Sequence, residues 1–543
     1  MLKLDAKLFL EKNRIVLKSE YHSDILKICR FLKEKKMAKW NASKKRWEFP
    51  LKEEIIERFK LLEIEIEIDE KLSKYFHKLK EEREAKLKAK EQEIELKTYL
   101  KNILHPYQRI GVGFLKVAKR AILADDMGLG KTLQTIALID EANLSKILIV
   151  CPNSLKYVWL NEINKWKLPK KAIIIDKLNQ RHPPEFYNKY DVWIINYEKI
   201  IIERYYNLLL SRNYDLLVFD EAHNLKNRKS KRSEAANILS KKADYLIEIT
   251  GTPIMNRTSE LWHLLHLLYP NEYKSYWKFV DRYAYVTRNY FGGYEVYGVK
   301  NEKKLRKELA PILIRRLKTE VLKELPEKTI EQIYLDLKPK QQKYYNAMEE
   351  EMSIELANDE SLDAPTVLAK IIRLKQIAVT PKLLDTSLEF DNAKYDFVLD
   401  ILNGTNDKVV IFSQFAKAIK LFAKELNAAG YKVVKYIGEM SPEERDKAIT
   451  QFQSDDETRV FLATLQAGGV GITLTSANIA IFLDKHWTPA INEQAQDRLH
   501  RIGQKKNVLI YELIAKNTIE EYIEQLLESK KDIIQAILEK YKK

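Results

Sequence analysis

The sequence predicts an α/β fold with two parallel-sheet lobes, helical insertions and a small α+β domain at the N-terminus. The chain has 543 residues, enough for about three to four domains. Its composition is 45% hydrophobic and 32% charged, a balance that can bury several cores. Short apolar segments alternate with amphipathic helices twice along the chain, which is typical of parallel strands that helices cover on both faces.

Residues 1–75 are predicted to form the small α+β domain. RIVLKS has the apolar content of a strand, a helix is predicted to begin at Ser23, and KWNASKKRWEFP indicates a hairpin with its turn over Asn41–Lys44. The first 50 residues hold 14 Lys and Arg against 6 Asp and Glu. Trp40 and Trp47 flank the turn, and two roles stay open for them: aromatic faces on a basic surface, or members of the core.

Two α/β lobes follow a helical connector. Residues 76–100 are almost all helix formers of mixed charge, which predicts a solvated helix. The first lobe is predicted over residues 101–340, with the strands AILADD, KILIVCP, DVWIINY, DLLVFDEAH and DYLIEITGTP and a helical insertion from about residue 258. The second is predicted over residues 341–543, with the strands KVVIFSQF, TRVFLATL, IAIFLDKHW and VLIYELIA. C-terminal helices are predicted from Thr518, which begins a capping box.

Charge and cysteine content narrow the class of protein. Lys and Arg outnumber Asp and Glu by 94 to 78, and the resulting net charge of +16 favours a polyanionic partner, although a generally basic protein without one is the alternative. The two cysteines, Cys29 and Cys151, are too few for a disulfide framework or a four-thiolate zinc site. No segment approaches the roughly 18 apolar residues that cross a bilayer. We therefore expect an intracellular protein without a membrane partner, in the cytoplasm and nucleoid or in the nucleus.

The segment AILADDMGLGKT has the order strand, glycine-containing loop, helix start. This order brings backbone N–H groups and a helix N-terminus to phosphate oxygens, with Lys131 on the β- and γ-phosphates and the Thr132 hydroxyl on Mg²⁺. The strict phosphate-loop pattern has glycine where Asp125 stands, so the match is imperfect. The loop residues predicted to bind ATP are Asp126, Met127, Gly128, Leu129 and Gly130.

Two further segments complete a predicted hydrolytic site. DLLVFDEAH places Asp220 and Glu221 at the carboxyl end of a buried strand, where Asp220 can bind magnesium and Glu221 can orient and deprotonate the attacking water. QAQDRLHRIGQ carries Arg498 and Arg501, three residues apart and hence on one face of a predicted helix. Such a pair can neutralise charge on the transferring phosphate, or it can pair with surface carboxylates.

From Leu104 almost to its end, the chain resembles the Swi/Snf-type ATPases of helicase superfamily 2. HPYQRIGVGFL, DDMGLGKT, DEAHNLKN, TGTP, IFSQF, LQAGGVGITLTSAN with DKHWTP, and QAQDRLHRIGQ follow one another in the order of that family's motifs. The acidic residue at position 125 is the family's own variant of the phosphate loop. Thr488 and Thr380–Pro381 depart from the family's usual Asn and His-Pro.

The resemblance implies two RecA-like lobes, ATP and Mg²⁺ as cofactors, and ATP-driven movement along double-stranded DNA. It places Gln108 on the adenine and Gln494 among the catalytic residues. The run from Lys226 to Arg232 has five basic residues in seven and suits phosphate contacts, although an exposed loop without a role is the alternative for Lys229–Arg232. The residues that the resemblance assigns to nucleic acid are Pro152, Asn153, Ser154, Trp159, Lys226, Asn227, Gly468, Gly469 and Trp487.

Other features bear on which DNA is bound. The N-terminal pattern W-N-x-x-x-K-x-W-x-F-P resembles the HARP modules of annealing helicases, which implies action at forked DNA. The alternative is a strand-separating DNA or RNA helicase, which needs a wedge; the Gly292–Gly293 turn in YFGGYEVYG is the candidate hairpin. A non-enzymatic scaffold would be expected to lack Lys131, Asp220, Glu221 or Arg501, and all four are present. Repair, remodelling, defence and transcription are all compatible with these features.

Overall fold

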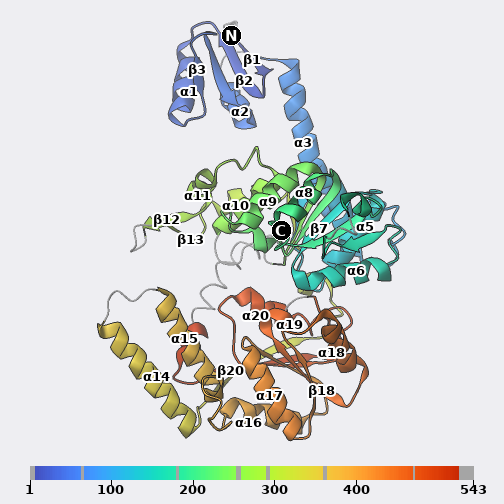
Figure 1. The fold of residues 1–543 in the computed structure, drawn as a ribbon. Helices are drawn as coiled ribbons and strands as arrows, with labels where there is room; N and C mark the ends of the chain where they lie inside the picture. The colour runs from blue at the N-terminus through green and yellow to red at the C-terminus, as the bar shows by residue number, and fades with distance from the viewer. Residues whose placement is uncertain are drawn as a thin grey trace. The chain divides into compact units, whose positions relative to one another are not determined.

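The computed structural model divides the chain into two compact units, Met1–Glu91 and Gln92–Lys543. Figure 1 shows the elements of each unit. None of the helices in the described part of the chain is both long and apolar enough to cross a membrane. The described residues are 6–62, 66–178, 183–251, 258–288, 294–358, 364–468 and 471–524.

The N-terminal unit contains a five-stranded sheet in the order β3-β4-β2-β1-β5. Neighbouring strands are antiparallel, except that β5 runs parallel to β1. The core packs Leu8, Leu17 and Phe49 of the sheet against Cys29 and Phe59 of two helices. The elements of this unit are β1 (Ala6–Glu11), β2 (Arg14–Ser19), α1 (Ser23–Glu34), β3 (Lys39–Asn41), β4 (Arg46–Pro50), α2 (Glu53–Lys60), β5 (Glu67–Ile68) and α3 (Glu70–Glu91).

The predicted hairpin is the pair β3–β4, and it separates the roles of its two tryptophans. Trp47 is half-buried and packs at the edge of the core, whereas Trp40 is 43% exposed. Their ring centroids lie 5.3 Å apart. β1 was not predicted from the sequence, because charged residues interrupt AKLFLE. The helix α3 is continuous through residues 76–91, most of the predicted connector.

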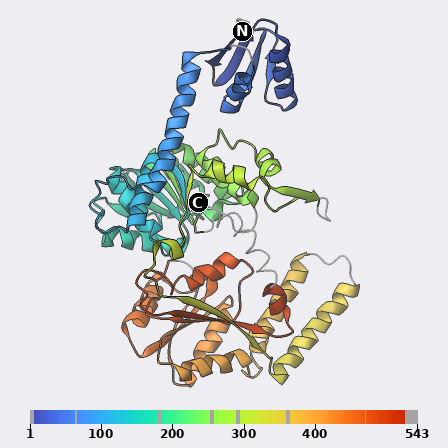
Figure 2. The same cartoon turned by 180° about the vertical axis from the view of Figure 1, so that it is seen from behind.

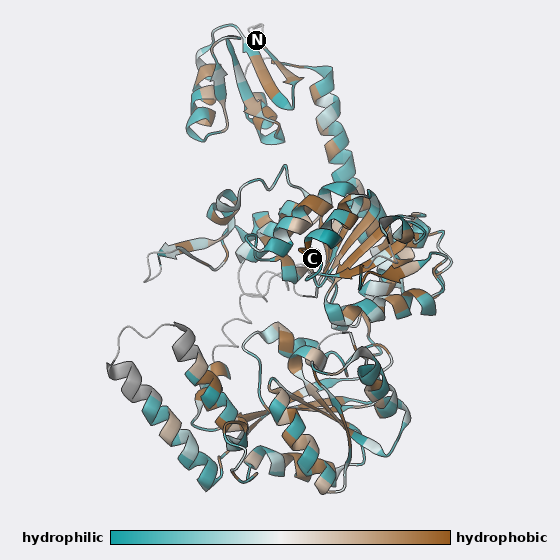
Figure 3. Cartoon of the chain, in the orientation of Figure 1, coloured by the Kyte–Doolittle hydropathy of each residue, from teal (hydrophilic) through white to brown (hydrophobic). Residues whose placement is uncertain are grey.

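The first lobe contains a seven-stranded sheet in the order β14-β6-β11-β10-β7-β9-β8, with every neighbouring pair parallel. This confirms the predicted α/β class, and the strands are among the most hydrophobic segments in Figure 3. The strands are β6 (Arg120–Leu123), β7 (Ile147–Cys151), β8 (Ala172–Ile174), β9 (Val192–Asn196), β10 (Tyr214–Asp220), β11 (Ala243–Ile249) and β14 (Leu313–Ile314).

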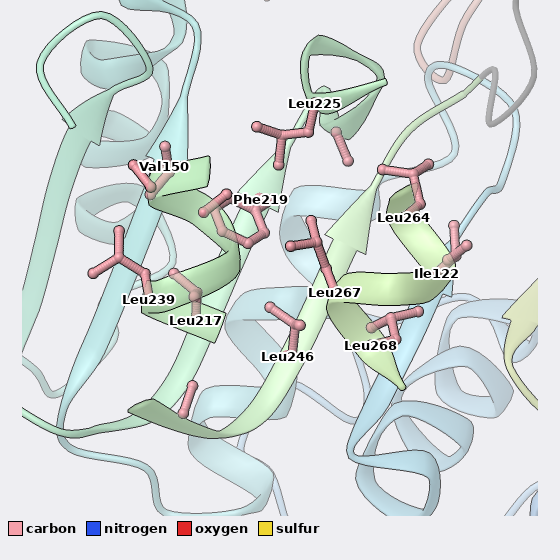
Figure 4. Packing of buried hydrophobic residues seen from close by; sticks show 14 of the residues in the cluster. Ile122, Val150, Leu217, Phe219, Leu225, Leu239, Leu246, Leu264, Leu267 and Leu268 are labelled. Carbon is pink, nitrogen blue, oxygen red and sulfur yellow. The ribbon is translucent and has the colours of Figure 1, made fainter. Parts of the chain in front are cut away.

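Helices cover both faces of this sheet because strand side chains alternate in direction. Along β10, Leu217 and Phe219 join the core beneath the helices that follow β9, β10 and β11, as Figure 4 shows for part of that core. Leu216 and Val218 join the core on the other face. The main covering helices are α4 (Pro106–Ala118), α5 (Lys131–Glu141) and α6 (Lys156–Lys165) on one face and α8 (Glu203–Leu210), α9 (Lys231–Leu239) and α10 (Leu261–Leu268) on the other.

The second lobe contains a six-stranded parallel sheet in the order β15-β20-β19-β16-β18-β17. Its first strand, β15, precedes residue 341, the predicted start of this lobe, and pairs with β20 of the same sheet. The strands are β15 (Lys328–Leu335), β16 (Val409–Ser413), β17 (Lys432–Tyr436), β18 (Thr458–Thr464), β19 (Ile479–Phe482) and β20 (Val508–Ala515). The helices are α14 (Pro339–Asn358), α15 (Ala364–Val379), α16 (Ala393–Gly404), α17 (Ala416–Ala428), α18 (Pro442–Ser454), α19 (Leu465–Gly468) and α20 (Pro489–Gln496).

The remaining elements occur as short pieces in the first lobe, several of them within the predicted helical insertion. At the C-terminal end, the Thr518 hydroxyl accepts from the Glu520 N–H, and residues 519–524 are helical; the rest of the predicted C-terminal helices lie outside the described residues. The short elements are α7 (Pro184–Tyr187), α11 (Tyr276–Tyr283), β12 (Tyr285–Arg288), β13 (Tyr294–Tyr297), α12 (Glu302–Leu309) and α13 (Lys318–Val321).

One buried carboxyl in the first sheet leads to a stability prediction. Glu248 of β11 is fully buried, and neither of its carboxylate oxygens has a hydrogen-bond partner among the described residues. Burial raises its pKa well above the usual range. The folded protein therefore keeps a proton that the unfolded chain releases above its ordinary pKa, so stability falls as pH rises. We expect Glu248→Leu to raise the melting temperature by roughly 3–8 °C at pH 8 and by less at pH 5.

Differential scanning calorimetry at the two pH values measures this gain. Glu234→Leu is the matched control, because Glu234 is exposed on α9. The prediction would be contradicted if Glu248→Leu raised the melting temperature at pH 8 by no more than Glu234→Leu does, or lowered it.

Candidate functional site

The loop between β6 and α5 has the geometry of a phosphate-binding turn. Gly128 and Gly130 have φ angles of 82° and 72°, which residues other than glycine rarely adopt. A Cβ on Gly130 would also lie 2.4 Å from Nε2 of Gln108, which donates to the carbonyl of Leu129 at 3.1 Å. The loop therefore turns tightly into the N-terminus of α5, where Lys131 and Thr132 are the first two residues.

Lys131 is held over this loop. Its Nζ donates to the carbonyl of Asp125 at 2.7 Å and to that of Asp126 at 3.1 Å. Burial lowers the pKa of Lys131, and the nearby carboxylates, Glu221 foremost, oppose that shift. The ammonium group is thus placed between the loop backbone and the carboxylate pair of β10.

Asp125, at the position of the first phosphate-loop glycine, is a buried anchor. It is fully buried. Its carboxylate accepts hydrogen bonds from Nε of Arg316, at 2.9 Å to Oδ1, and from Nη2 of Arg316. Nε2 of Gln134 donates to Oδ2 at 3.0 Å. Removing one partner of such a pair leaves an uncompensated buried charge, at a cost of about 3–5 kcal/mol. The departure from the strict pattern is therefore structural: it ties the loop to the segment after β14.

The same segment makes further contacts that were not predicted from the sequence. Arg315 donates to the carbonyls of Ala124 and Gly251 at 3.1 and 2.7 Å and pairs with Asp126 at 3.1 Å. Lys318 donates through its backbone N–H to Asp126 at 3.1 Å. One available signal was the position of two arginines directly after an apolar strand, since ligands of parallel sheets bind at the carboxyl ends of strands.

Lys318 also reaches the second lobe. Its Nζ pairs with Oδ1 of Asp497 at 2.6 Å and donates to the carbonyl of His500 at 2.7 Å, and the side chain is almost completely buried. One residue thus contacts the phosphate loop and the turn that carries Arg498 and Arg501. These contacts suit Lys318 to position the two segments relative to each other.

Replacement of Lys318 should therefore separate turnover from nucleotide binding. We expect Lys318→Met to lower kcat for ATP hydrolysis by roughly 10–100-fold with a KM within about threefold of the wild-type value, because the arginine turn loses its tie to the loop. Steady-state ATPase kinetics measure this split. Lys420→Met, which removes a pair with Glu439 on the surface, is the matched control. A turnover within twofold of wild type would count against the positioning role.

Asp220 and Glu221 lie at the carboxyl end of β10, as predicted. Oδ1 of Asp220 accepts from the Glu221 N–H at 2.9 Å, and Oδ2 accepts from Nε1 of Trp159 at 2.8 Å. Burial, followed by the charge of Glu221, raises the pKa of Asp220 to about 7. Burial alone would raise the pKa of Glu221, but His223, whose Nδ1 lies 3.3 Å from Oε2, and Lys131 lower it overall. Glu221 is therefore the ionised member of the pair at neutral pH.

The backbone of Glu221 is in the left-handed region, with φ 49° and ψ 53°. Non-glycine residues adopt this conformation at a cost of about 1–3 kcal/mol, and they do so mostly where the surroundings enforce it. The charge of Lys131 acts on the carboxylate that this turn carries.

A magnesium ion fits the residues at this edge. No group of three or more His, Cys, Asp or Glu within the described ranges could hold a metal by itself. Mg²⁺ needs only one or two side chains, because substrate phosphates and water supply the other ligands. A cation next to Asp220 would also favour the ionised form of a carboxylate whose pKa burial raises. Asp220 and the Thr132 hydroxyl are the residues that would hold it.

The predicted first-lobe DNA segment begins where β7 ends. Pro152, Asn153 and Ser154 enter a short 3-10 helix over Asn153–Leu155, and Asn153 is exposed. Trp159 is only 1% exposed, and its indole N–H donates a hydrogen bond to the carboxylate of Asp220. In this conformation its ring therefore has no face open to nucleic acid.

The arginine segment of the second lobe differs from the predicted helix. α20 ends at Gln496, and i→i+3 bonds from the N–H groups of Arg498 and Leu499 tighten the chain into turns. Arg498 and Arg501 nevertheless converge, since each donates to the carbonyl of Ile472, at 3.4 and 3.2 Å. Burial, and then the charge of Arg501, lowers the pKa of Arg498 to about 10.

The two arginines approach the first lobe. A Cβ on Gly128 would lie 2.8 Å from Cβ of Arg501, so Arg501 packs against the phosphate loop. The charge of Arg498 acts on Glu221. Gln494 is buried on α20. The structure thus brings Arg498 and Arg501 of the second lobe close to the phosphate loop and the carboxylate pair of the first.

Further predicted DNA residues divide between the lobes. Lys226 pairs with Glu260 at 3.3 Å and Asn227 is exposed, in the basic run after the carboxylate pair. Trp487 is half-buried, and the Nζ of Lys375 lies 4.8 Å from the centroid of its ring. Gly468 ends α19 against Phe412. Gly469, and the Thr252–Pro253 half of TGTP, lie outside the described residues.

Comparison with known proteins supports the same family as the motifs. The profile of the SNF2-related domain matches residues 34–383, and that of the helicase conserved C-terminal domain matches residues 393–503. An uncharacterized ATP-dependent helicase of Mycoplasma genitalium is 32% identical over 449 residues, covering 80% of this chain and 42% of that protein. The DNA annealing helicase and endonuclease ZRANB3 of Homo sapiens is 31% identical over 455 residues, covering 81% and 41%.

The chain thus spans about two fifths of the length of the curated relatives that it matches. Among solved structures, the SWI2/SNF2 ATPase core of Sulfolobus solfataricus in complex with double-stranded DNA is 31% identical, with a TM-score of 0.40, covering 82% of this chain and 95% of that one. The SNF2-related profile alone covers well over half of the chain. The resemblance inferred from the motifs is confirmed: the chain belongs to the SNF2-related family of helicase superfamily 2.

Proposed function

We propose that this chain is a DNA-dependent ATPase that uses ATP hydrolysis to move along double-stranded DNA. The observation that carries the proposal is that residues of both lobes meet at the phosphate loop. Lys131 and the Asp220–Glu221 pair lie at one edge of the first sheet, and Arg501 of the second lobe packs against Gly128 of the phosphate loop. Hydrolysis that needs both lobes can drive their relative movement.

In this proposal the chain positions the triphosphate and stabilises the charge that develops on it. The loop N–H groups from Asp126 to Gly130 and the ammonium group of Lys131 bind the phosphates, and Gln108 lies beside the adenine. Glu221 orients the attacking water and accepts its proton. Arg498 and Arg501 neutralise charge on the transferring phosphoryl group. Magnesium, when bound by Asp220 and Thr132, neutralises charge on the phosphate oxygens.

The DNA substrate is supported by charge and by relatives. The basic run from Lys226 to Arg232 directly follows the carboxylate pair, and phosphate contacts of this kind are independent of base sequence. ZRANB3, 31% identical over most of this chain, is a DNA annealing helicase. Exposed Trp40, above Trp47 on the basic N-terminal hairpin, supports a HARP-like role at forked DNA. A DNA substrate also implies an intracellular location.

ATPase rates with no DNA, blunt duplex, single strand and fork test the proposal. We expect duplex to stimulate turnover at least tenfold, and the DNA concentration for half-maximal stimulation to rise steeply with salt. Lys131→Ala should reduce the stimulated rate by roughly 10²–10³-fold, because the phosphate loses its preorganised cation. Absence of stimulation by duplex, or undiminished turnover in Lys131→Ala, would reject the proposal.

A strand-separating helicase is the second candidate. YVTR and YEVY pair as the antiparallel strands β12 and β13, and the Gly292–Gly293 turn lies outside the described residues. Displacement of a labelled strand from a tailed duplex, measured alongside translocation on blunt duplex, distinguishes the two activities.

A further inference from the structure

A row of aromatic rings crosses the insertion of the first lobe, outside the nucleotide site. Trp262 of α10 contacts Tyr276 at 5.6 Å between ring centroids, Tyr276 contacts Trp277 at 5.2 Å, and Trp277 contacts Tyr294 of β13 at 5.6 Å. Exposure increases along the row: Trp262 is buried, whereas Trp277 is 49% and Tyr294 60% exposed. The row therefore begins in the core and ends on the surface.

The hairpin β12–β13 presents the outer end of this row. In Figures 1 and 2 it extends away from the seven-stranded sheet. Its register pairs Arg288 with Tyr294 and Val286 with Val296, so these four side chains share one face. Val296 packs against Val280 and anchors that face, while Val286, Arg288 and Tyr294 stay exposed. The hairpin is thus fixed at its base and carries an exposed aromatic and a cation side by side.

The other face of the hairpin is aromatic as well. Tyr285 and Tyr297 are directly paired and stacked, with centroids 5.8 Å apart, and each ring is about half exposed. The Nζ of Lys300 lies 5.8 Å from the centroid of the Tyr285 ring. Both faces therefore combine exposed rings with basic groups.

Charge continues from this surface to the proposed DNA-binding run. The guanidinium of Arg228, within the run from Lys226 to Arg232, lies over Tyr276 at 4.4 Å from the ring centroid. Residues 271–310 contain nine Lys and Arg against five Asp and Glu. Exposed rings set among cations fit a polyanion that also offers flat apolar faces, which is single-stranded nucleic acid. An intact duplex hides its base faces, so the rings would have little to stack on.

We propose that Trp277 and Tyr294 stack on the bases of an unpaired DNA strand that adjoins the duplex held by the motor. The backbone of that strand then follows the cations between Arg228 and Arg288, and the aromatic row supplies contacts that tolerate any base sequence. This inference rests on the proposed function, because it assigns the second part of a forked substrate to a motor that binds the first.

A fork with 2-aminopurine in its single-stranded arm tests the stacking directly. Binding of the wild-type chain is expected to change the fluorescence of the base, and Trp277→Ala/Tyr294→Ala should abolish that change and weaken fork binding by about 5–100-fold. Trp277→Phe/Tyr294→Phe should retain most of both, since the rings remain. Tyr522→Ala is the matched control, because Tyr522 is 63% exposed in the second lobe, away from this row in the sequence.

Blunt duplex is the internal reference. If the double alanine variant binds both fork and blunt duplex with the wild-type affinity, the inference is wrong. The proposed function still stands in that case, provided that duplex stimulates the ATPase of the wild type. If no DNA stimulates the wild type, the proposed function itself fails. If the alanine variant loses self-association in sedimentation experiments but keeps its fork affinity, the row is a protein contact, which also overturns the inference.

Discussion

Glu221→Gln is expected to reduce DNA-stimulated ATP turnover by roughly 10²–10⁴-fold while ATP still binds. The substitution keeps the size of the side chain but removes the group that can accept a proton from water. Glu221 is ionised at neutral pH, as that role requires, because His223 and Lys131 lower its pKa despite burial, whereas burial and Glu221 raise the pKa of Asp220 to about 7. The pKa values of the two neighbouring carboxyls are thus shifted in opposite directions.

Single-turnover kinetics with a fluorescent ATP analogue separate binding from hydrolysis in this variant. Glu198→Gln is a matched control, since Glu198 is an exposed carboxyl after β9, in hydrogen-bond contact with Asn196. Turnover of Glu221→Gln within tenfold of wild type would show that another group accepts the proton. Loss of nucleotide binding instead would show that the left-handed turn at this position had collapsed.

The sequence was sufficient to predict the features that contiguous segments determine. Apolar runs such as DLLVFD predicted parallel strands, because nearly every residue in them is buried on both faces. β15 was not predicted, because KTIEQIYL lies at the edge of its sheet and keeps polar side chains exposed. Charged residues hid β1 as well, although that strand lies between β2 and β5. Strands that keep partly exposed side chains lack the continuous apolar signal of fully buried strands.

Contacts between distant segments could not be predicted. The Asp125–Arg316 pair joins residues 191 positions apart, and Lys318 meets Asp497 of the other lobe. Neither the conformation of Glu221 nor the burial of Trp159 follows from local pattern, since both depend on how β10 and α6 pack. The positions of these residues at strand ends and loop turns were therefore predictable from motifs, while the contacts that orient them were not.

Arg501→Ala is expected to lower kcat by roughly 10³–10⁵-fold, with ATP and duplex binding changed less than tenfold. Alanine retains the Cβ that packs near Gly128 and removes only the guanidinium. That group would act when charge develops on the phosphoryl group, so its loss should affect the transition state more than the bound substrate. Arg501→Lys should recover only part of the rate, because an ammonium group lacks the planar fork of guanidinium.

Arg498 provides the decisive comparison. Both guanidinium groups donate to the carbonyl of Ile472, and the charge of Arg501 helps to lower the pKa of Arg498. Two groups that act on one developing charge should be non-additive, so Arg498→Ala/Arg501→Ala should be little slower than either single variant. Stopped-flow release of inorganic phosphate measures all three rates. Strictly multiplicative losses would mean that the arginines act at separate steps, and that the meeting of the lobes at Gly128 places only one of them on the reacting phosphate.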